Sequence, residues 1–201
     1  MESSTSICNM ALARLGAQRI TDYGDNSDTK KEAIYCRLFY TQTAKALMRS
    51  HLWRFARHRV QLSQDTETPA FEYDYAYTLP NDFLRHVLLW DGSDLPGGRV
   101  YTSYDIEGDR VLIDESTVYL KYLRWIPSEA DWDPLFIEVM VLQLAKKLCM
   151  PLSQDAEIKA DLDRDLEPLM RRVRALDRQE AEHWGRDELK VWLDSRYSDI
   201  A

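Results

Sequence analysis

Apolar residues near the N-terminus recur at helical spacing. Ile7, Ala11 and Leu15 are four residues apart, which places them on one face of a helix. Ser4 or Thr5 is suited to the helix start, and Gly16 can adopt the left-handed conformation that ends a helix. The pattern therefore predicts a short first helix.

A polar loop separates this helix from a longer one. Residues 22–28 are rich in Asp, Asn, Gly and Ser, and Thr29 with Glu32 has the spacing of a capping box. A second helix is therefore expected from Thr29. Its predicted inward face consists of Ala33, Cys36, Tyr40, Ala44, Leu47 and Met48.

The spacing becomes strand-like after Trp53 and Phe55, which we interpret as core at the junction of helix and sheet. Alternation from residue 71 to 78 predicts a strand with four aromatics on one face, and the sequence Leu-Pro-Asn-Asp at 79–82 ends it. No helix-length crossover separates the later strands, so an antiparallel meander is expected. The predicted later strands are 86–90, 100–104, 110–113 and 117–123, with a loop at 91–98 and a tight turn at 107–109.

Helical spacing returns after Pro127. Asp131 or Asp133 can cap a helix that is apolar nearly all round from 135 to 150, which predicts a central helix ended by Pro151. Ser153 is the expected cap of a last helix that Pro168 should kink or interrupt. The apolar stripe of that helix is Ile158, Leu162, Leu166, Leu169, Val173 and Leu176, and the pattern dissolves from Ala181.

These elements predict an α+β fold. An antiparallel helical bundle is expected from residues 1–56 and 127–180, with an antiparallel β-rich insertion, sandwich-like or barrel-like, at 57–126. Residues 181–201 are predicted to be an extended C-terminal docking tail, because their aromatics are too few to build a core of their own.

Composition and net charge argue against several classes of function. The 201 residues are 45% hydrophobic and carry a formal net charge of −8, which argues against general affinity for duplex DNA. The sequence has neither an apolar run of about 18 residues nor a signal-like N-terminus, so we expect no membrane association and a location in a cytoplasm. The three widely spaced cysteines are interpreted as buried free thiols.

No motif for chemistry stands out. The four histidines have no metal-ligand spacing, and no nucleophile elbow, zinc-protease, phosphate-loop or dinucleotide motif occurs. We therefore expect no catalytic residue, metal or cofactor, although a pair such as Asp74 with Asp82 or Glu115 leaves glycosidase-like chemistry open. Arg171, Arg172, Arg174 and Arg178 form a basic patch, interpreted as a salt-bridged surface because acidic residues are interleaved with it.

Several segments carry a family resemblance. The sequence ICNMALARLG (7–16), then Ile-Thr-Asp at 20–22, the Asp-rich gap, the helix from Lys31 and HLWRFARHRVQL (51–62) together resemble the tail tubular protein A family of short-tailed bacteriophages. FEYDYAYTLPNDFLR (71–85) is similar to the aromatic strand and Leu-Pro-x-Asp step of such proteins, and the helix pair after Pro127 occupies the matching place. The resemblance extends over residues 6–178 and depends on the order of several weak motifs.

The resemblance implies a head-to-tail adaptor, or gatekeeper. Such proteins form a ring, a dodecamer in family members, between the portal protein and the tail nozzle protein, and they extend the channel through which DNA passes. An acidic balance suits a lumen through which DNA slides without specific binding. The expected location is the head-tail junction of the virion, with the host cytoplasm as the place of assembly.

The resemblance also suggests which residues meet each partner. Trp184, Trp192 and Tyr197 are predicted to dock on the portal, and the isolated chain is expected to remain a monomer until a portal ring orders its tail. Asp91, Gly92, Asp94 and Leu95, in the loop 91–98, are predicted to face the tail nozzle.

Two other interpretations stay open at this point. One is a phage peptidoglycan hydrolase that uses a Glu or Asp as acid or base. The other is a small bacterial interaction module unrelated to virions.

Overall fold

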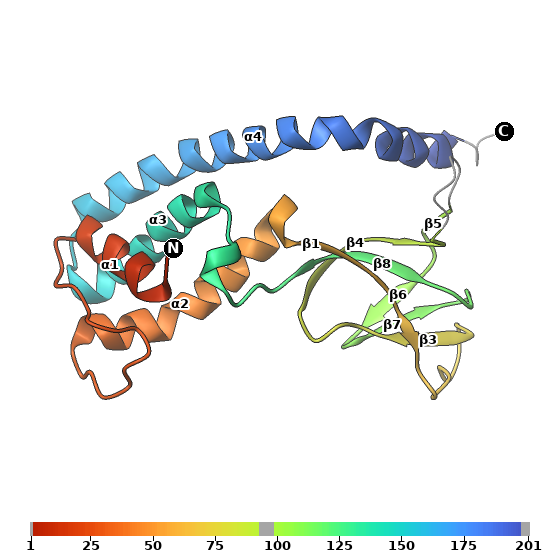
Figure 1. Cartoon of the computed structure of the whole chain (residues 1–201), viewed down its shortest axis with the longest axis horizontal. Helices are drawn as coiled ribbons and strands as arrows, with labels where there is room; N and C mark the ends of the chain where they lie inside the picture. Colours follow the sequence, from red (N-terminus) through yellow and green to blue (C-terminus); the bar gives the residue numbers. More distant parts are fainter. Residues whose placement is uncertain (1, 93–98, 198–201) are drawn as a thin grey trace. The chain divides into compact units, whose positions relative to one another are not determined.

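The computed structural model describes residues 2–92 and 99–197, with side chains for 2–92 and 99–179. Contacts divide the chain into a helical unit, formed by 1–51 and 126–178, and a second unit that contains the continuous segment 52–125. The helical unit and the antiparallel sheets of the second unit confirm the predicted α+β class (Figure 1). The predicted domain boundaries at 56/57 and 126/127 compare with unit boundaries at 51/52 and 125/126.

Helix α1 spans Ser4–Arg14 and begins as predicted. The Ser3 hydroxyl accepts a hydrogen bond from the Ser6 N–H at 3.2 Å, and Gly16 at φ +64° follows the last turn. The Asn9 side chain donates to the Ile20 carbonyl at 3.0 Å and accepts from its N–H at 2.8 Å. These two hydrogen bonds hold the backbone of Ile20, in the segment that follows the helix, against the side of α1.

Helix α2 spans Lys31–Ser50, and the predicted capping box does not form. The Asp28 carboxylate accepts from the Lys30 N–H at 3.0 Å, and the Arg37 guanidinium donates to the carbonyls of Asp25 and Asp28 at 2.7 Å each. Loop carbonyls and a carboxylate therefore fix the start of this helix in place of Thr29. The whole predicted inward face is buried.

Helix α3 spans Pro134–Leu152 and is the central helix of its unit, as predicted. The Asp133 carboxylate accepts from the N–H groups of Leu135 and Phe136 at 2.7 and 3.4 Å, with Pro134 in the first turn. Pro151 lies inside the final turn, one residue before the helix ends. Figure 1 shows α3 between α2 and α4.

Helix α4 spans Ala156–Tyr197; its cap is not the predicted one, Pro168 does not interrupt it, and it continues into the segment where an extended tail was expected. Asp155, and not Ser153, caps it: its carboxylate accepts from the N–H groups of Glu157 and Ile158 at 2.8 and 3.2 Å. Ser153 instead donates to the Cys149 carbonyl and belongs to the end of α3. The helix runs through Pro168 without a break and continues past Ala181, where helix formers outweigh the lost apolar period.

The core of the helical unit is mainly aliphatic. Leu162 and Val173 of α4 are buried, and the other members of its predicted stripe are half-buried. Cys8, Cys36 and Cys149 are buried and unbridged, as predicted. A hydrogen bond with Cys36, together with burial, raises the pKa of the Cys8 thiol, which keeps it protonated and unreactive.

The second unit consists of two sheets of four antiparallel strands. The order is β1-β8-β4-β5 in one sheet and β2-β3-β7-β6 in the other. Antiparallel pairing is confirmed, but the later strands do not form the predicted meander, because the sequence neighbours β5 and β6 lie in different sheets, as do β7 and β8. The strands are β1 (Arg57–Gln61), β2 (Ser63–Gln64), β3 (Tyr75–Thr78), β4 (Phe83–Trp90), β5 (Val100–Tyr101), β6 (Asp105–Glu107), β7 (Arg110–Ile113) and β8 (Tyr119–Arg124).

One apolar core joins the two sheets, which makes the unit a sandwich. Tyr77 of β3 and Val111 of β7 pack in the same cluster as Leu89 of β4 and Leu120 of β8. The inward-facing side chains of one sheet thus pack against those of the other sheet.

The predicted row of four aromatics is half right. Tyr75 and Tyr77 lie on β3, with Tyr77 fully buried. Glu72 takes φ +75°, which breaks the extended backbone, and Phe71 is 77% exposed. Tyr73 lies before the strand and donates its hydroxyl to Asp105 at 3.0 Å. Alternation of residue types continues through this break although the strand does not.

Candidate interaction surfaces

The exposed side of α2 is the most unusual surface of the helical unit. Ile34 and Leu38 are 46% and 61% exposed, while the opposite side of the helix is buried. Exposed Lys31, Lys45 and Arg49 lie on the same side, because all five residues repeat at helical spacings of three, four or seven. We call this set the α2 stripe; it combines an apolar centre with cations toward both helix ends.

Aromatic residues border the α2 stripe. Tyr35 and Phe39 are half-buried, and their rings stack with centroids 6.2 Å apart and planes 13° from parallel. Such stacked rings restrict each other's rotamers, so the apolar part of the surface is preordered. This surface was not predicted from the sequence, because the apolar positions of the inward face dominate the helical pattern. A second apolar pair at i and i+4, Ile34 and Leu38, is the signal that indicates it.

The first half of α4 has the opposite charge. Six carboxylates and two cations lie between Asp155 and Glu167. Asp163 pairs with Lys146 of α3, and Asp161 pairs with Arg164 at 2.8 Å. Exposed Glu157, Asp161 and Asp165 follow one another at i and i+4, and we call them the α4 acidic row.

The predicted basic patch lies further along α4. Arg171, Arg172 and Arg178 are exposed and Arg174 is half-buried. Two of the carboxylates interleaved with it bond to other elements: Asp163 to Lys146 and Asp177 to His51.

A cavity of about 250 Å³ lies between α2, α3 and α4. Ser50, Gln143, Lys147 and Arg174 are among its polar lining residues, with Leu47 and Met170 as apolar ones. Its volume is below the range of about 300 to 1,000 Å³ that is typical of small-molecule sites.

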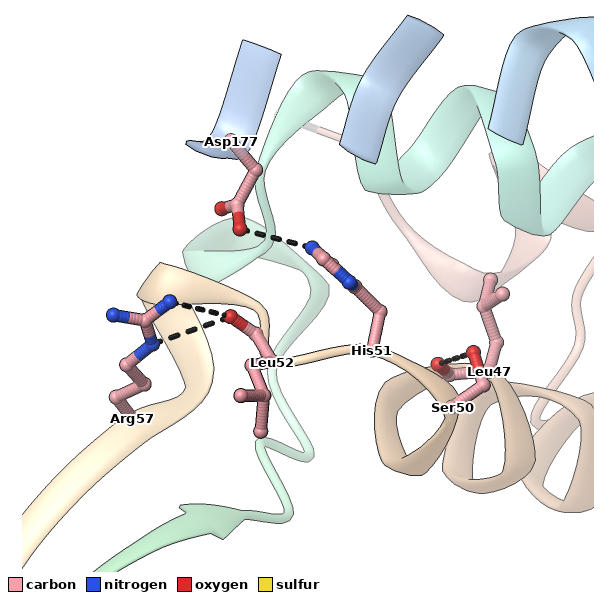
Figure 2. A network of polar contacts seen from close by, with 6 residues as sticks. All are labelled: Leu47, Ser50, His51, Leu52, Arg57 and Asp177. Carbon is pink, nitrogen blue, oxygen red and sulfur yellow. Dashed lines mark hydrogen bonds and ion pairs between the residues drawn. The ribbon is translucent and has the colours of Figure 1, made fainter. Parts of the chain in front are cut away.

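Figure 2 shows the polar contacts around the end of α2. The His51 Nε2 atom lies 2.9 Å from the Asp177 Oδ2 atom, with side chains only 13% and 14% exposed, so α4 is tied to the residue that ends α2. Further along the chain, the Arg57 guanidinium donates to the Leu52 carbonyl at 3.2 and 2.9 Å. The first contact joins α4 to the end of α2, and the second fixes the backbone at Leu52, so both have a structural role.

The two aromatic residues predicted at this junction differ in burial. Trp53 is 2% exposed and Phe55 is half-buried, with ring centroids 6.1 Å apart. Trp53 caps the start of the short helix η1 (Arg54–Ala56), and Phe55 lies within it, directly before β1.

The predicted tail-side loop is described only at its base. The Asp91 N–H donates to the Arg99 carbonyl at 3.1 Å, and its carboxylate accepts from the Arg99 N–H at 3.0 Å. Gly92 takes φ +79°, where a Cβ atom would lie 2.2 Å from the Tyr119 ring. Asp94 and Leu95 lie outside the described residues.

The predicted portal-docking residues lie in α4, but their side chains are outside the described part of the structure. Trp184, Trp192 and Tyr197 therefore remain a prediction from the sequence. The backbone places all three in a continuous helix.

The residues considered for hydrolysis have separate partners. Asp74 donates its backbone N–H to Asp114, Asp82 accepts from the Tyr122 hydroxyl at 2.9 Å, and Glu115 pairs with Arg99 at 3.1 Å. Within the described residues, no group of three or more His, Cys, Asp or Glu side chains is arranged to hold a metal ion. None of the described helices is both long and apolar enough to cross a membrane.

Comparison with known proteins adds no relative. Neither a scan against protein-family models nor a search of curated proteins gives a match to this chain.

Proposed function

We propose that this chain is a structural virion protein, the head-to-tail adaptor of a short-tailed bacteriophage. In this role it forms a ring between the portal protein and the tail nozzle protein and extends the DNA channel. The observation that carries the proposal is the order of elements: α1 and α2 precede a β sandwich, and α3 and α4 follow it. That order agrees with the segments through which the sequence resembles the tail tubular protein A family.

The proposal assigns a task to each part of the chain. The helical unit forms the body of the ring, and the loop 91–98 faces the nozzle. Trp184, Trp192 and Tyr197 dock on the portal. The net charge of −8 favours passage of DNA over binding, because phosphates are repelled by a carboxylate-rich surface. The proposed location is the head-tail junction of the virion, after assembly in the host cytoplasm.

Light scattering on chromatographed samples tests this function directly. The full chain is measured alone and then mixed with the portal protein encoded in the same genome. The proposal expects the chain to join the portal ring. A W184A/W192A/Y197A variant should lose this association, and an F71A variant, which removes an aromatic that is 77% exposed elsewhere, should keep it.

Two results would contradict the proposal. If the wild-type chain stays apart from the portal at every protein and salt concentration, the adaptor function is wrong, and the chain is then assayed for peptidoglycan hydrolysis. If the triple variant binds the portal as well as the wild type does, the docking assignment is wrong.

A further inference from the structure

The cavity between α2, α3 and α4 has a basic lining. Lys147 of α3 and Arg174 of α4 are half-buried beside it, and none of its lining residues is acidic. The chain as a whole contains more Asp and Glu, 34, than Lys and Arg, 26. A cavity with two cations and no carboxylate is therefore not explained by the composition of the chain.

The two cations of the cavity have no carboxylate partner within the described residues. No Asp or Glu lies three or four residues from Lys147 along α3. At these spacings from Arg174 the one acidic residue is Asp177, whose carboxylate lies 2.9 Å from the His51 ring (Figure 2). Charged side chains that are partly removed from water are usually paired, so both cations are suited to an anion from outside the chain.

The hydrogen-bond donors of the lining come from α3 and α4. On α2, the hydroxyls of Thr43 and Ser50 already donate to the carbonyls of Phe39 and Leu47, at 2.6 and 2.7 Å. The Arg174 guanidinium can bind two oxygens of one ligand, the Lys147 ammonium a third, and the Gln143 amide lies in the same lining. This set of donors matches a ligand with several oxygens and a negative charge.

The size of the cavity limits the ligand to a small one. Its volume of about 250 Å³ is many times the roughly 10–15 Å³ that one water molecule needs, but it is too small for most drug-sized molecules. A phosphate group with a few hydration waters fits this space. A phosphate monoester carries a charge of about −1.5 to −2 at pH 7, which balances two cations, whereas a carboxylate balances one.

We propose that this cavity is a binding site for a phosphate group, supplied by inorganic phosphate or by a small phosphate monoester. The site goes beyond the adaptor function and does not depend on it. Because Lys147 belongs to α3 and Arg174 to α4, the bound group joins two helices. Leu162 and Val173 are the buried side chains in the described part of α4, so such a bridge adds to the attachment of this helix.

Isothermal titration calorimetry on the full chain tests the site, with sodium phosphate added at constant ionic strength and neutral pH. The wild type should bind one phosphate per chain. Variant K147Q/R174Q removes both cations and should raise the Kd by about tenfold or more. Phosphate should also raise the midpoint of thermal unfolding of the wild type and leave that of the variant unchanged, because only a ligand that binds the folded state stabilises it.

Variant K31Q/R171Q is the matched control. It also removes one Lys and one Arg, so its net charge equals that of the first variant, but both side chains are exposed and lie outside the cavity lining. It should bind phosphate like the wild type. Circular dichroism establishes that each variant is folded. Lys147→Gln alone, which should raise the Kd by about threefold or more, keeps the test decisive if the double variant does not fold.

Adenosine monophosphate and acetate, titrated under the same conditions, identify the ligand. Binding of phosphate or of adenosine monophosphate that K147Q/R174Q loses supports the proposal, and the tighter of the two shows the source of the phosphate group. If neither binds the wild type, or if the cavity variants bind as tightly as the control, the proposal is wrong. If acetate binds as tightly as phosphate, the cavity takes a carboxylate, such as a side chain of a partner protein, and the phosphate assignment is wrong.

Discussion

The helical unit and the β sandwich have cores that differ in the type of side chain they bury and in how the chain supplies them. In the helical unit, α3 contributes Phe136, Met140, Leu144 and Leu148 to a core closed by segments from both ends of the chain. The sandwich is built from one continuous segment, and its core contains buried tyrosines. Aliphatic side chains have no polar atoms to satisfy, whereas each tyrosine hydroxyl needs a partner. The helical core has few such groups: the buried Tyr40 hydroxyl donates to Glu129 at 3.0 Å, and the Trp132 Nε1–H donates to the Ile126 carbonyl at 2.9 Å.

The tyrosines of the sandwich find those partners in loops. The hydroxyl of Tyr77 donates to the Glu115 carbonyl at 2.7 Å, that of Tyr101 to the Thr117 carbonyl at 3.3 Å, and that of Tyr122 to the Asp82 carboxylate at 2.9 Å. The side chains that fill the sandwich core thus also fix the segments between its strands. The core of the helical unit therefore depends mainly on the volume of its apolar side chains, whereas the sandwich core depends on volume together with several tyrosine hydroxyls that stay protonated.

The largest effect is expected in the core of the helical unit. Phe136→Ala removes a ring that is 0% exposed and leaves a cavity, which should lower the free energy of unfolding by about 3–5 kcal/mol. Urea unfolding measures the loss, and hydrogen exchange should show it in peptides from 1–51 and 126–178. Leu38→Ala, at a side chain 61% exposed, is the control and should stay within about 0.5 kcal/mol of the wild type. A cost for Phe136→Ala as small as the control's would show that α3 is not central.

The next effect concerns the base of the loop 91–98 in the sandwich. Gly92→Ala combines a left-handed backbone, at φ +79°, with a Cβ atom 2.2 Å from the Tyr119 ring, and should cost about 2–4 kcal/mol. Gly108→Ala is the matched control, because φ is +59° but nothing lies within 4 Å of the added Cβ, so only about 1–2 kcal/mol is expected. Thermal unfolding of both variants measures the difference. Equal costs would mean that Tyr119 moves aside freely.

Alkaline pH should weaken the sandwich through its tyrosines. Burial raises the pKa of Tyr77 and Tyr101, and burial followed by the hydrogen bond to Asp82 raises the pKa of Tyr122. Unfolded tyrosine titrates near about pH 10, so the stabilising effect is complete below that pH. It is lost as the pH rises further, because the unfolded chain ionises first. Urea unfolding over this pH range, with tyrosinate absorbance as a second signal, should show the decline.

Tyr122→Phe tests the contribution of one hydroxyl. At neutral pH it leaves the Asp82 carboxylate without this donor and should cost about 1–3 kcal/mol. Above about pH 10 its stability should fall less steeply than that of the wild type, since one titrating group has been removed. An unchanged slope would show that Tyr122 does not take part in the alkaline loss.

The smallest effect separates two helix caps within the helical unit. Asp155→Ala removes the carboxylate that caps α4 and should cost about 0.5–2 kcal/mol. Thr29→Ala should stay within about 0.5 kcal/mol of the wild type, because α2 has no side-chain cap at its start. Denaturant midpoints compare the two. A larger cost for Thr29→Ala would support the capping box that the sequence predicts.

Strong local patterns could be interpreted correctly from the sequence. The inward face of α2, the buried α3 and the Gly108 turn all follow from apolar period and backbone preference, which act within a few residues. The aromatic alternation at 71–77 predicted too long a strand. Residue type does not reveal the φ of +75° at Glu72, which breaks the extended backbone before β3. Ile34 and Leu38 were missed as a surface, since apolar residues on a helix can face a core or solvent.

The sequence by itself determined the α+β class, the antiparallel pairing and most element positions, since these depend on periodicity and turn chemistry over short distances. Only the tertiary structure decided which strands share a sheet, because β1 pairs with β8 across more than half of the sandwich segment. It also decided that α2 exposes an apolar stripe and that His51 meets Asp177. Contacts between distant residues depend on how completed elements pack, and that information is spread over the whole chain and not held in any one local pattern.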